Sequence, residues 1–297
     1  MNHNKHHRHE QNPERTYVDA FQHTYVTIRR NLHLAKHATG KGGITSTEDR
    51  QMFSRSSRQF ADSLPDNDPR SVSANIFAQL PDYMHAITTL PDRRNPDHRD
   101  RKISKETREQ EVEKTIKYNN VLRDIINHNQ NLTPRTLLKT VSAVAMRYGY
   151  SDKERELVID RTKGDLKGMQ HELAFESVLY YLPEGFEIID TDNQDDARGA
   201  DYMVRCPNGT VVSIDVKATQ RLQDEAQERK AYHASRFNQT MPSNEIILYS
   251  GFTQSDFDTQ SPWRPTQDAV MSVLPHVESE LLRASGDAQY HAKTLVE

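Results

Sequence analysis

The sequence predicts an α+β or α/β fold, in which a mainly helical N-terminal region precedes a small core of the order αβββαβ. Apolar residues recur at helical spacing through most of the first half of the chain. Short apolar or β-branched runs at 200–206, 210–218 and 245–250 are typical of strands. A helix and one more short strand are expected before these runs, and another helix separates the last two.

The chain of 297 residues has room for two modest domains, each with its own core. We expect a disordered His-rich tail at 1–15, a helical region at 16–150, the αβββαβ core at 151–260, and a C-terminal helix with a tail at 261–297. A charged segment at 90–102 is expected to be an exposed linker. The N-terminal histidines could bind a transition metal, but nothing fixes their geometry, so a solvated tail is the expectation.

Four helices are expected in the N-terminal region. The first two cover 18–34 and 46–61, and the third runs over 105–127. The fourth has Thr133 as its N-cap, a proline at its first position and Gly149 at its end. Helices of this kind usually form a packing scaffold.

The helix that opens the core carries an apolar stripe that includes Leu166 and Met169, and Pro183 ends it. Glu172 and Glu176 lie one turn apart on this helix. Either carboxylate could lean over the sheet, and the sequence does not decide between them.

A hairpin follows, with Pro207-Asn208-Gly209 at its turn. A two-residue Asn-Gly turn would place Asp201 opposite Val216. A three-residue loop uses the proline to preset a type I turn and the glycine for a left-handed residue. That loop places Asp201 directly across from Asp215, and it is the register we expect.

Strand alternation separates the two faces of the second hairpin strand. Asp215 and Lys217 project on one face beside Asp201, and opposed carboxylates repel each other unless a cation lies between them. Such a cluster can hold a hard divalent cation beside a phosphodiester, which points to nuclease chemistry. The other face is expected to be core and carries Val212, Ile214, Val216 and Ala218.

An Asp-x-Lys or Glu-x-Lys tripeptide alone is a weak signal, because further copies occur at 100–102, 165–167 and 228–230. Those copies lie in polar or helical surroundings and are expected on solvated faces. The tripeptide at 215–217 lies inside an apolar strand, where an unpaired Asp and Lys would be costly to bury.

The remaining elements complete the expected order. A helix is predicted at 222–238 and a strand at 245–250. Thr266 can cap a last helix that extends to about Arg283 and is kinked at Pro275.

A set of short motifs in 165–250 resembles those of one nuclease family. They are Lys167-Gly168 with Glu172 (a G-x-x-x-E helix start), Gly199-Ala200-Asp201, the Asn208-Gly209 turn, and Ile214-Asp215-Val216-Lys217-Ala218-Thr219. This segment resembles the PD-(D/E)xK nuclease superfamily, and within it the archaeal Holliday-junction resolvases and related restriction-endonuclease-like proteins. The family's Pro before its first Asp is Ala200 here. The Gln-x-x-x-Tyr motif of the RecB-like branch is absent, since Glu228 stands four residues before Tyr232.

The resemblance implies a restriction-endonuclease-like core and a Mg²⁺-dependent DNA endonuclease acting in repair, recombination or restriction. Asp201, Asp215 and the Val216 carbonyl would bind Mg²⁺, or Mn²⁺ in its place, and Glu172 would reach the ion directly or through water. Lys217 would orient or help to deprotonate the attacking water. Hydrolysis would leave a 5′-phosphate and a 3′-hydroxyl. Many relatives are dimers, so the analogy also suggests a homodimer.

Charge is unevenly distributed along the chain. Residues 1–164 hold 28 Lys and Arg against 21 Asp and Glu, whereas residues 165–260 hold 8 against 17. So acidic a core is a poor platform for DNA unless the metal, the N-terminal region or a partner helps. A local basic patch is the other source of attraction. Its candidate nucleic-acid-binding residues are Arg198, Arg221, Lys230 and Arg236, with Arg205 and Arg229 beside them.

Two other functions stay open. The acidic core favours a catalytically silent module that keeps the fold and binds nucleic acid or a protein. An RNA-targeting or toxin-like nuclease would use the same chemistry, and the sequence does not separate RNA from DNA.

Cysteine content and hydropathy indicate the compartment. The single cysteine, Cys206, excludes an internal disulfide and suits a reducing cytoplasm. No run approaches the roughly 18 apolar residues of a membrane span, and no signal peptide is visible. We therefore expect a cytoplasmic protein without a membrane partner.

Overall fold

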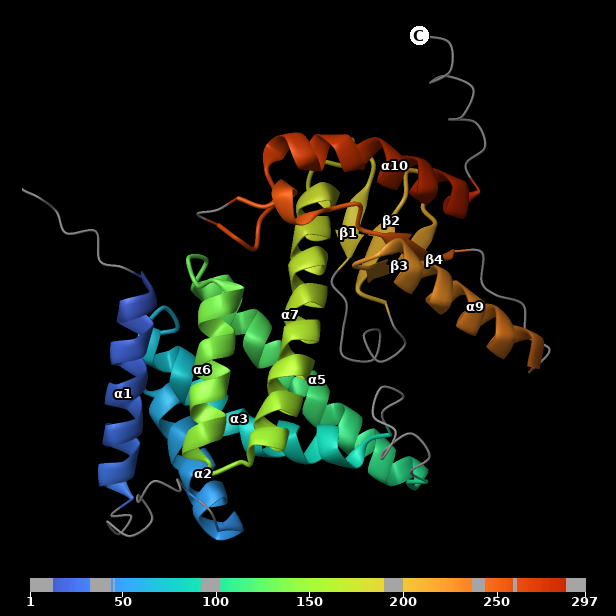
Figure 1. Cartoon of the computed structure of the whole chain (residues 1–297). Coiled ribbons are helices and arrows are strands. Elements are labelled where there is room, and N and C mark those ends of the chain that lie inside the picture. The colour runs from blue at the N-terminus through green and yellow to red at the C-terminus, as the bar shows by residue number, and fades with distance from the viewer. Residues whose placement is uncertain are drawn as a thin grey trace, which may run out of the picture. The chain divides into compact units, whose positions relative to one another are not determined.

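The computed structural model is an α+β molecule and describes residues 13–32, 44, 46–91, 102–189, 200–236, 244–258 and 261–286. The chain divides into two compact units, Met1–Leu166 and Lys167–Glu297. Most of the His-rich tail and most of the linker expected at 90–102 lie outside the described residues. Figure 1 traces the elements along the chain.

The described part of the first unit is helical. Ser46, Asp68, Ser104 and Thr133 cap four of its helices, and each side chain accepts a main-chain N–H of the first turn. The helices are α1 (Pro13–Asn31), α2 (Thr47–Asp62), α3 (Pro69–Thr89), α5 (Lys105–His128), α6 (Pro134–Arg147) and the first part of α7 (Asp152–Leu179).

The α3 helix was not among the predicted elements. Asp68 followed by Pro69 is a helix start signal, with an N-cap and a proline at the first position. Pro81 lies inside the helix and weakens the sequence signal, because a proline normally interrupts a helix. Burial holds α3 in place, since Phe77 and Leu80 have no exposed surface.

Five aromatic rings form the centre of the helical unit around Phe77. Its ring centroid lies 5.0 Å from that of Phe53 and 5.6 Å from that of Phe21. Tyr25 stacks on Phe77, and the Tyr148 hydroxyl donates to the Phe77 carbonyl. One side chain of α3 therefore contacts rings from α1, from α2 and from the C-cap of α6.

A stacked pair of tyrosines makes another buried contact in this unit, and one of them hydrogen-bonds to Asp165. The rings of Tyr83 and Tyr118 stack with centroids 3.9 Å apart, and the Tyr83 hydroxyl donates to Oδ2 of Asp165 over 2.6 Å. The tripeptide at 165–167 was expected on a solvated face. For Asp165 that prediction is wrong, because its carboxylate is partly buried and accepts the tyrosine hydroxyl.

The second unit contains a four-stranded sheet of order β1-β2-β3-β4. β2 is antiparallel to both β1 and β3, and β4 runs parallel to β3 after a helical crossover. The α-β-β-β-α-β order of elements agrees with the sequence prediction. After α7, the elements are β1 (Glu187–Ile189), β2 (Tyr202–Arg205), β3 (Val211–Lys217), α9 (Gln220–Arg236), β4 (Glu245–Tyr249), a 3-10 turn (Gln254–Asp256) and α10 (Gln267–Ser285), which Thr266 caps and which contains Pro275.

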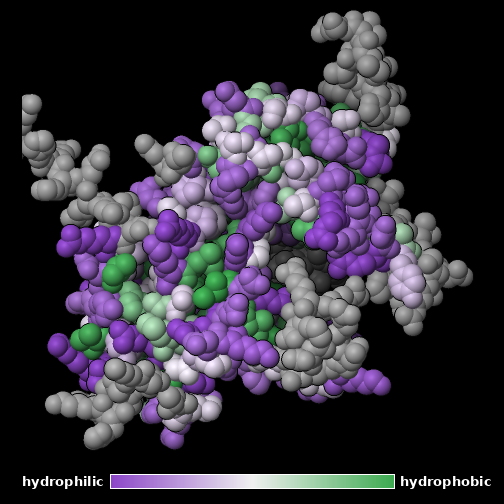
Figure 2. Space-filling view, in the orientation of Figure 1, coloured by the Kyte–Doolittle hydropathy of each residue, from purple (hydrophilic) through white to green (hydrophobic). Residues whose placement is uncertain are grey.

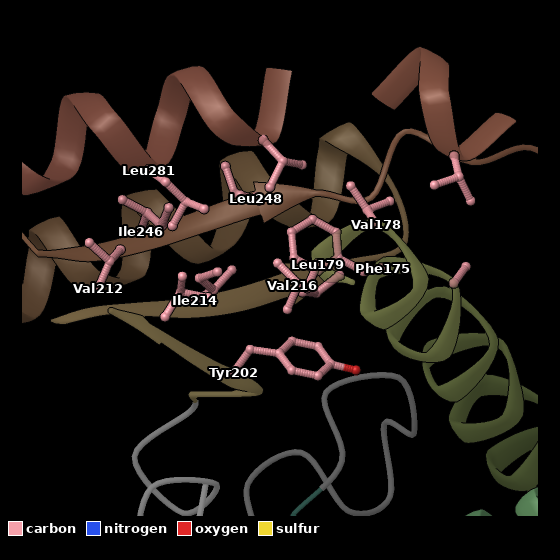
Figure 3. Packing of buried hydrophobic residues seen from close by; sticks show 14 of the residues in the cluster. Phe175, Val178, Leu179, Tyr202, Val212, Ile214, Val216, Ile246, Leu248 and Leu281 are labelled. Carbon is pink, nitrogen blue, oxygen red and sulfur yellow. The ribbon is translucent and has the colours of Figure 1, made fainter. Parts of the chain in front are cut away.

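The core of this unit lies on one face of the sheet (Figure 3). Val212, Ile214 and Val216 point into it, as alternation along β3 predicted. Ala218 was expected to join them, but β3 ends at Lys217 and Ala218 is only partly buried. The helices that cover this face contribute Phe175, Val178 and Leu179 from α7, and Val270, Val277 and Leu281 from α10.

The α7 helix begins at Asp152, so the prediction that Lys167-Gly168 starts a helix is wrong. Ser151 and Glu154 form a capping box at the true start. The Ser151 N–H donates to Oε2 of Glu154 over 2.7 Å, and the Glu154 N–H donates to Oγ of Ser151 over 3.3 Å. Gly168 is therefore in the interior of the helix, one turn before Glu172.

Among the residues that the structure describes, none of the helices combines the length and the apolar character needed to cross a bilayer. Figure 2 shows hydrophilic side chains over most of the face in view.

Candidate functional site

The hairpin turn sets the register of the candidate site. Gly209 has φ +84°, and its N–H donates to the Cys206 carbonyl over 2.8 Å. The Cys206 N–H donates to the Thr210 carbonyl over 2.8 Å, so the loop has three residues, as predicted. Tyr202 is paired with Ile214 in the same register.

Asp201 lies immediately before β2, where the ladder ends. Continuing the register places it across from Asp215, as expected. Its N–H donates to the Ile214 carbonyl over 2.8 Å, and its Oδ2 accepts the Val216 N–H over 2.6 Å. The Asp201 carboxylate is thus held against the main chain of β3 at Val216, the residue between Asp215 and Lys217.

Asp215 and Lys217 lie on the face of β3 opposite the core. Asp215 is 8% exposed, which is low for a carboxylate. The Lys217 ammonium forms an ion pair with Oδ1 of Asp215. In the tripeptide at 215–217, Asp215 and Val216 are therefore buried, Lys217 is partly buried, and the two charged side chains are paired.

The neighbouring helix supplies Glu172. The Tyr202 hydroxyl donates to the Glu172 carbonyl over 2.8 Å, which holds this turn of α7 next to the start of β2. The Glu172 carboxylate acts electrostatically on Asp201. Glu176 accepts the Tyr180 hydroxyl at Oε1 instead, over 3.2 Å. Of the two glutamates that the sequence left open, Glu172 is the one whose charge reaches Asp201.

Burial and the crowding of charge both shift the pKa of Asp201. Burial raises its pKa to about 7, and the negative charges of Glu172 and then Asp215 act in the same direction. The Val216 N–H and the Lys217 ammonium oppose the rise. Three carboxylates from three elements thus compete at one end of β3, and a cation placed among them would relieve the repulsion.

The donor atoms suit a hard divalent cation, because all are carboxylate or carbonyl oxygens. Their arrangement is not a ready ligand cage. Within the ranges that the structure describes, no three His, Cys, Asp or Glu side chains are placed so as to hold one metal ion. Lys217 occupies an oxygen of Asp215, and the Val216 N–H occupies one of Asp201. An ion at Oδ1 of Asp215 would have to displace the lysine.

The predicted nucleic-acid-binding residues do not form a free basic patch where they are described. Nη1 of Arg221 lies 3.0 Å from Glu225, and Nζ of Lys230 lies 3.7 Å from Glu245. Arg198 and the side chain of Arg236 lie outside the described residues. Exposed pairs of this kind are weak, so a phosphate could compete for the cations. Arg205 is likewise paired, with Glu187.

Two buried polar residues at the site were not singled out from the sequence. His171 precedes Glu172 on α7, and its Nδ1 lies 2.6 Å from Oγ of Ser250. Burial lowers the His171 pKa to about 4, so the ring is neutral near pH 7. The sequence offered one signal for His171, its place directly before the candidate ligand Glu172. Its partner Ser250 lies 79 residues away in sequence, so their contact depends on tertiary packing.

Comparisons with known proteins add no assignment: no family model matches the sequence, and neither the curated proteins nor the solved structures contain a significant match. The functional argument therefore rests on the residues and contacts of this chain.

Proposed function

We propose that this chain is a metal-dependent nuclease of the PD-(D/E)xK type that hydrolyses phosphodiester bonds, most directly as a DNA endonuclease. The observation that carries the proposal is the convergence of Glu172, Asp201, Asp215 and Lys217 on one end of β3. They come from α7, from the residue before β2, and from β3 itself. Their mutual influence is visible in the raised pKa of Asp201.

The surrounding architecture supports the same reading. The α-β-β-β-α-β order of the described elements is what the family resemblance implies, and the antiparallel β2–β3 hairpin has the expected register. The three-residue turn is needed as well, because a shift of one residue would move Asp201 away from Asp215. A restriction-endonuclease-like core is therefore part of the proposal.

Each residue has a role that its contacts permit. Asp201, Asp215 and the Val216 carbonyl would hold Mg²⁺ or Mn²⁺, with Glu172 reaching it directly or through water. The bound ion would neutralise charge that develops on the phosphate as the bond breaks. Lys217, released from Asp215, would orient the attacking water or help to remove its proton. The apolar layer beneath β3 keeps these side chains on a rigid strand.

Cleavage of a mixed panel tests the proposal. Linear duplex DNA, a branched junction, single-stranded DNA and RNA are incubated with Mg²⁺ or Mn²⁺ and with wild type, Asp215→Ala or Lys217→Ala. We expect metal-dependent cleavage by wild type that is reduced at least about 10³-fold in both variants, because each removes a group required in the transition state.

The chain offers a control in an exposed carboxylate of α9. Glu228→Ala removes the acid of a similar tripeptide away from β3 and leaves Lys230, a candidate nucleic-acid-binding residue, in place. This variant should cleave at the wild-type rate. Unimpaired cleavage by Asp215→Ala would show that the activity resides elsewhere.

A catalytically silent binding module is the second candidate, and two observations favour it. The ammonium of Lys217 already pairs with Asp215, and Arg205, Arg221 and Lys230 of the predicted patch pair with acids of the same chain. Calorimetric titration separates the candidates. A folded wild-type chain that takes up no Mg²⁺ or Mn²⁺ supports the silent module, whereas uptake that is lost in Asp215→Ala supports the nuclease. RNA cleavage alone in the panel would instead indicate the RNA-targeting alternative.

A further inference from the structure

The turn of α7 that carries Glu172 is held by two polar contacts from different strands. One is the Tyr202 hydroxyl, which donates to the Glu172 carbonyl over 2.8 Å. The other is the 2.6 Å hydrogen bond between Nδ1 of His171 and Oγ of Ser250. Consecutive residues of the helix are thus attached to β2 and to the residue that follows β4.

Both ends of the His171–Ser250 contact are shielded from water. His171 is 5% exposed and Ser250 is fully buried. The His171 ring also lies edge-on to Phe257, with centroids 5.9 Å apart, so packing limits its rotation. A buried hydrogen bond between fixed partners is specific in direction, because neither partner can turn to water as a substitute.

Ser250 also contacts β3, the strand that carries Asp215 and Lys217. The N–H of Ser250 donates to the Lys217 carbonyl over 3.0 Å. A chain of two hydrogen bonds therefore runs from the main chain of Lys217, through Ser250, to His171, the residue before Glu172. The Tyr202 contact links the same turn of α7 to Asp201, because Tyr202 directly follows Asp201 in sequence and donates to the Glu172 carbonyl.

We infer that His171 is a positioning residue for the proposed metal site. Its hydrogen bond to Ser250 fixes the position of α7 relative to β3, so that the Glu172 carboxylate reaches Asp201 and Asp215. The inference rests on the proposed function. His171 touches neither substrate nor metal in this role. Partners that orient metal ligands commonly change metal affinity by about 10- to 100-fold when they are removed.

The test measures Mn²⁺ affinity by calorimetry on the full chain after removal of metal with a chelator. His171→Leu keeps bulk but loses the ring nitrogen, and we expect a 10- to 100-fold weaker affinity. His171→Asn places an amide atom about where Nδ1 lies, so it should restore affinity to within about threefold of wild type. Ser250→Ala removes the partner oxygen and leaves only a small void, and it should weaken binding as His171→Leu does.

Gln170 supplies the matched control on the same helix. Its buried side chain donates to the Pro262 carbonyl over 2.6 Å, a contact that does not lead to the carboxylates. Gln170→Leu should leave the Mn²⁺ affinity within about threefold of wild type. The fluorescence of Trp263, the chain's single tryptophan and a buried residue of the second unit, reports whether each variant is folded.

The outcomes separate this inference from the function beneath it. Weak binding in His171→Leu and Ser250→Ala, with recovery in His171→Asn, supports it. Equal affinity in His171→Leu, His171→Asn and wild type would overturn it while leaving the nuclease proposal in place. An equal loss in Gln170→Leu would also overturn it, because any loosening of α7 would then suffice. A folded wild type that binds no Mn²⁺ would overturn the nuclease proposal first and this inference with it.

Discussion

Asp201 is held where its negative charge is disfavoured. It is partly buried beside two other carboxylates, and the Val216 N–H that it accepts compensates only in part. Folding therefore makes Asp201 easier to protonate than it is in the unfolded chain, and a cation placed among the carboxylates would oppose that change. Charge crowding of this kind is common at catalytic and metal sites, where stability is exchanged for function.

A pH dependence of stability follows for the metal-free protein. Folded Asp201 keeps its proton up to about pH 7, whereas the unfolded chain releases it near pH 4. The folded state binds more protons between these values, so its free energy of unfolding falls as pH rises, by up to about 1.4 kcal/mol per pH unit. Urea unfolding followed by Trp263 fluorescence, with chelator present, measures this slope.

Asp201→Asn is the control for that slope, because the amide does not titrate. The variant should lose most of the decline in stability between pH 4 and pH 7. An unchanged slope in Asp201→Asn would assign the effect to another group. Addition of Mn²⁺ should also reduce the decline in wild type, since a bound cation favours the ionised carboxylate.

At the scale of elements, two glycines of the second unit have opposite roles. Gly209 adopts φ +84° at the hairpin turn, a conformation that L-residues disfavour. Gly168 lies inside α7, where a Cβ would meet Oε1 of Glu172 at 3.7 Å, an ordinary contact. We expect Gly209→Ala to lower the free energy of unfolding by about 1–2 kcal/mol. Gly168→Ala should raise it by about 0.5–1 kcal/mol.

Trp263 fluorescence during urea unfolding measures both variants, because both glycines belong to its unit. Each variant serves as the control of the other, since the chemical change is the same. Destabilisation by both would show that the added methyl group, and not the backbone conformation, decides the outcome.

Elements governed by local chemistry were predictable from the sequence. The Pro-Asn-Gly turn set the β2–β3 register, which in turn placed Asp201 across from Asp215. The start of α7 also has a local signal, because Ser151 and Glu154 have the spacing of a capping box, whereas the family resemblance implied a helix start at Lys167-Gly168. Contacts such as Tyr202 with Glu172 and His171 with Ser250 join distant segments, so no local pattern announces them.

At the scale of the whole molecule, the boundary between the two units falls at Leu166 within α7. A fragment that starts at Lys167 would open with a lysine at the positive end of the helix dipole and without an N-cap. A fragment that starts at Ser151 keeps the capping box. We expect the 151–286 fragment to have the higher unfolding midpoint in urea, followed by Trp263 fluorescence.

Equal unfolding midpoints of the two fragments in urea would contradict this prediction, because residues 151–166 would then add no stability to the second unit. The 286 end point suits both fragments, because Gly286 closes α10 with φ +76°. The difference between them is then confined to 151–166.

The continuity of α7 has a consequence for how this chain could be rearranged. A recombination event that joined a foreign segment at Leu166 would cut through a helix, and one that joined it at Ser151 would strip Val158 and Leu166 of the neighbours that bury them. Each junction therefore disturbs either the helix or its packing. A swap of either half between proteins is expected to lower the stability of the product at both junctions.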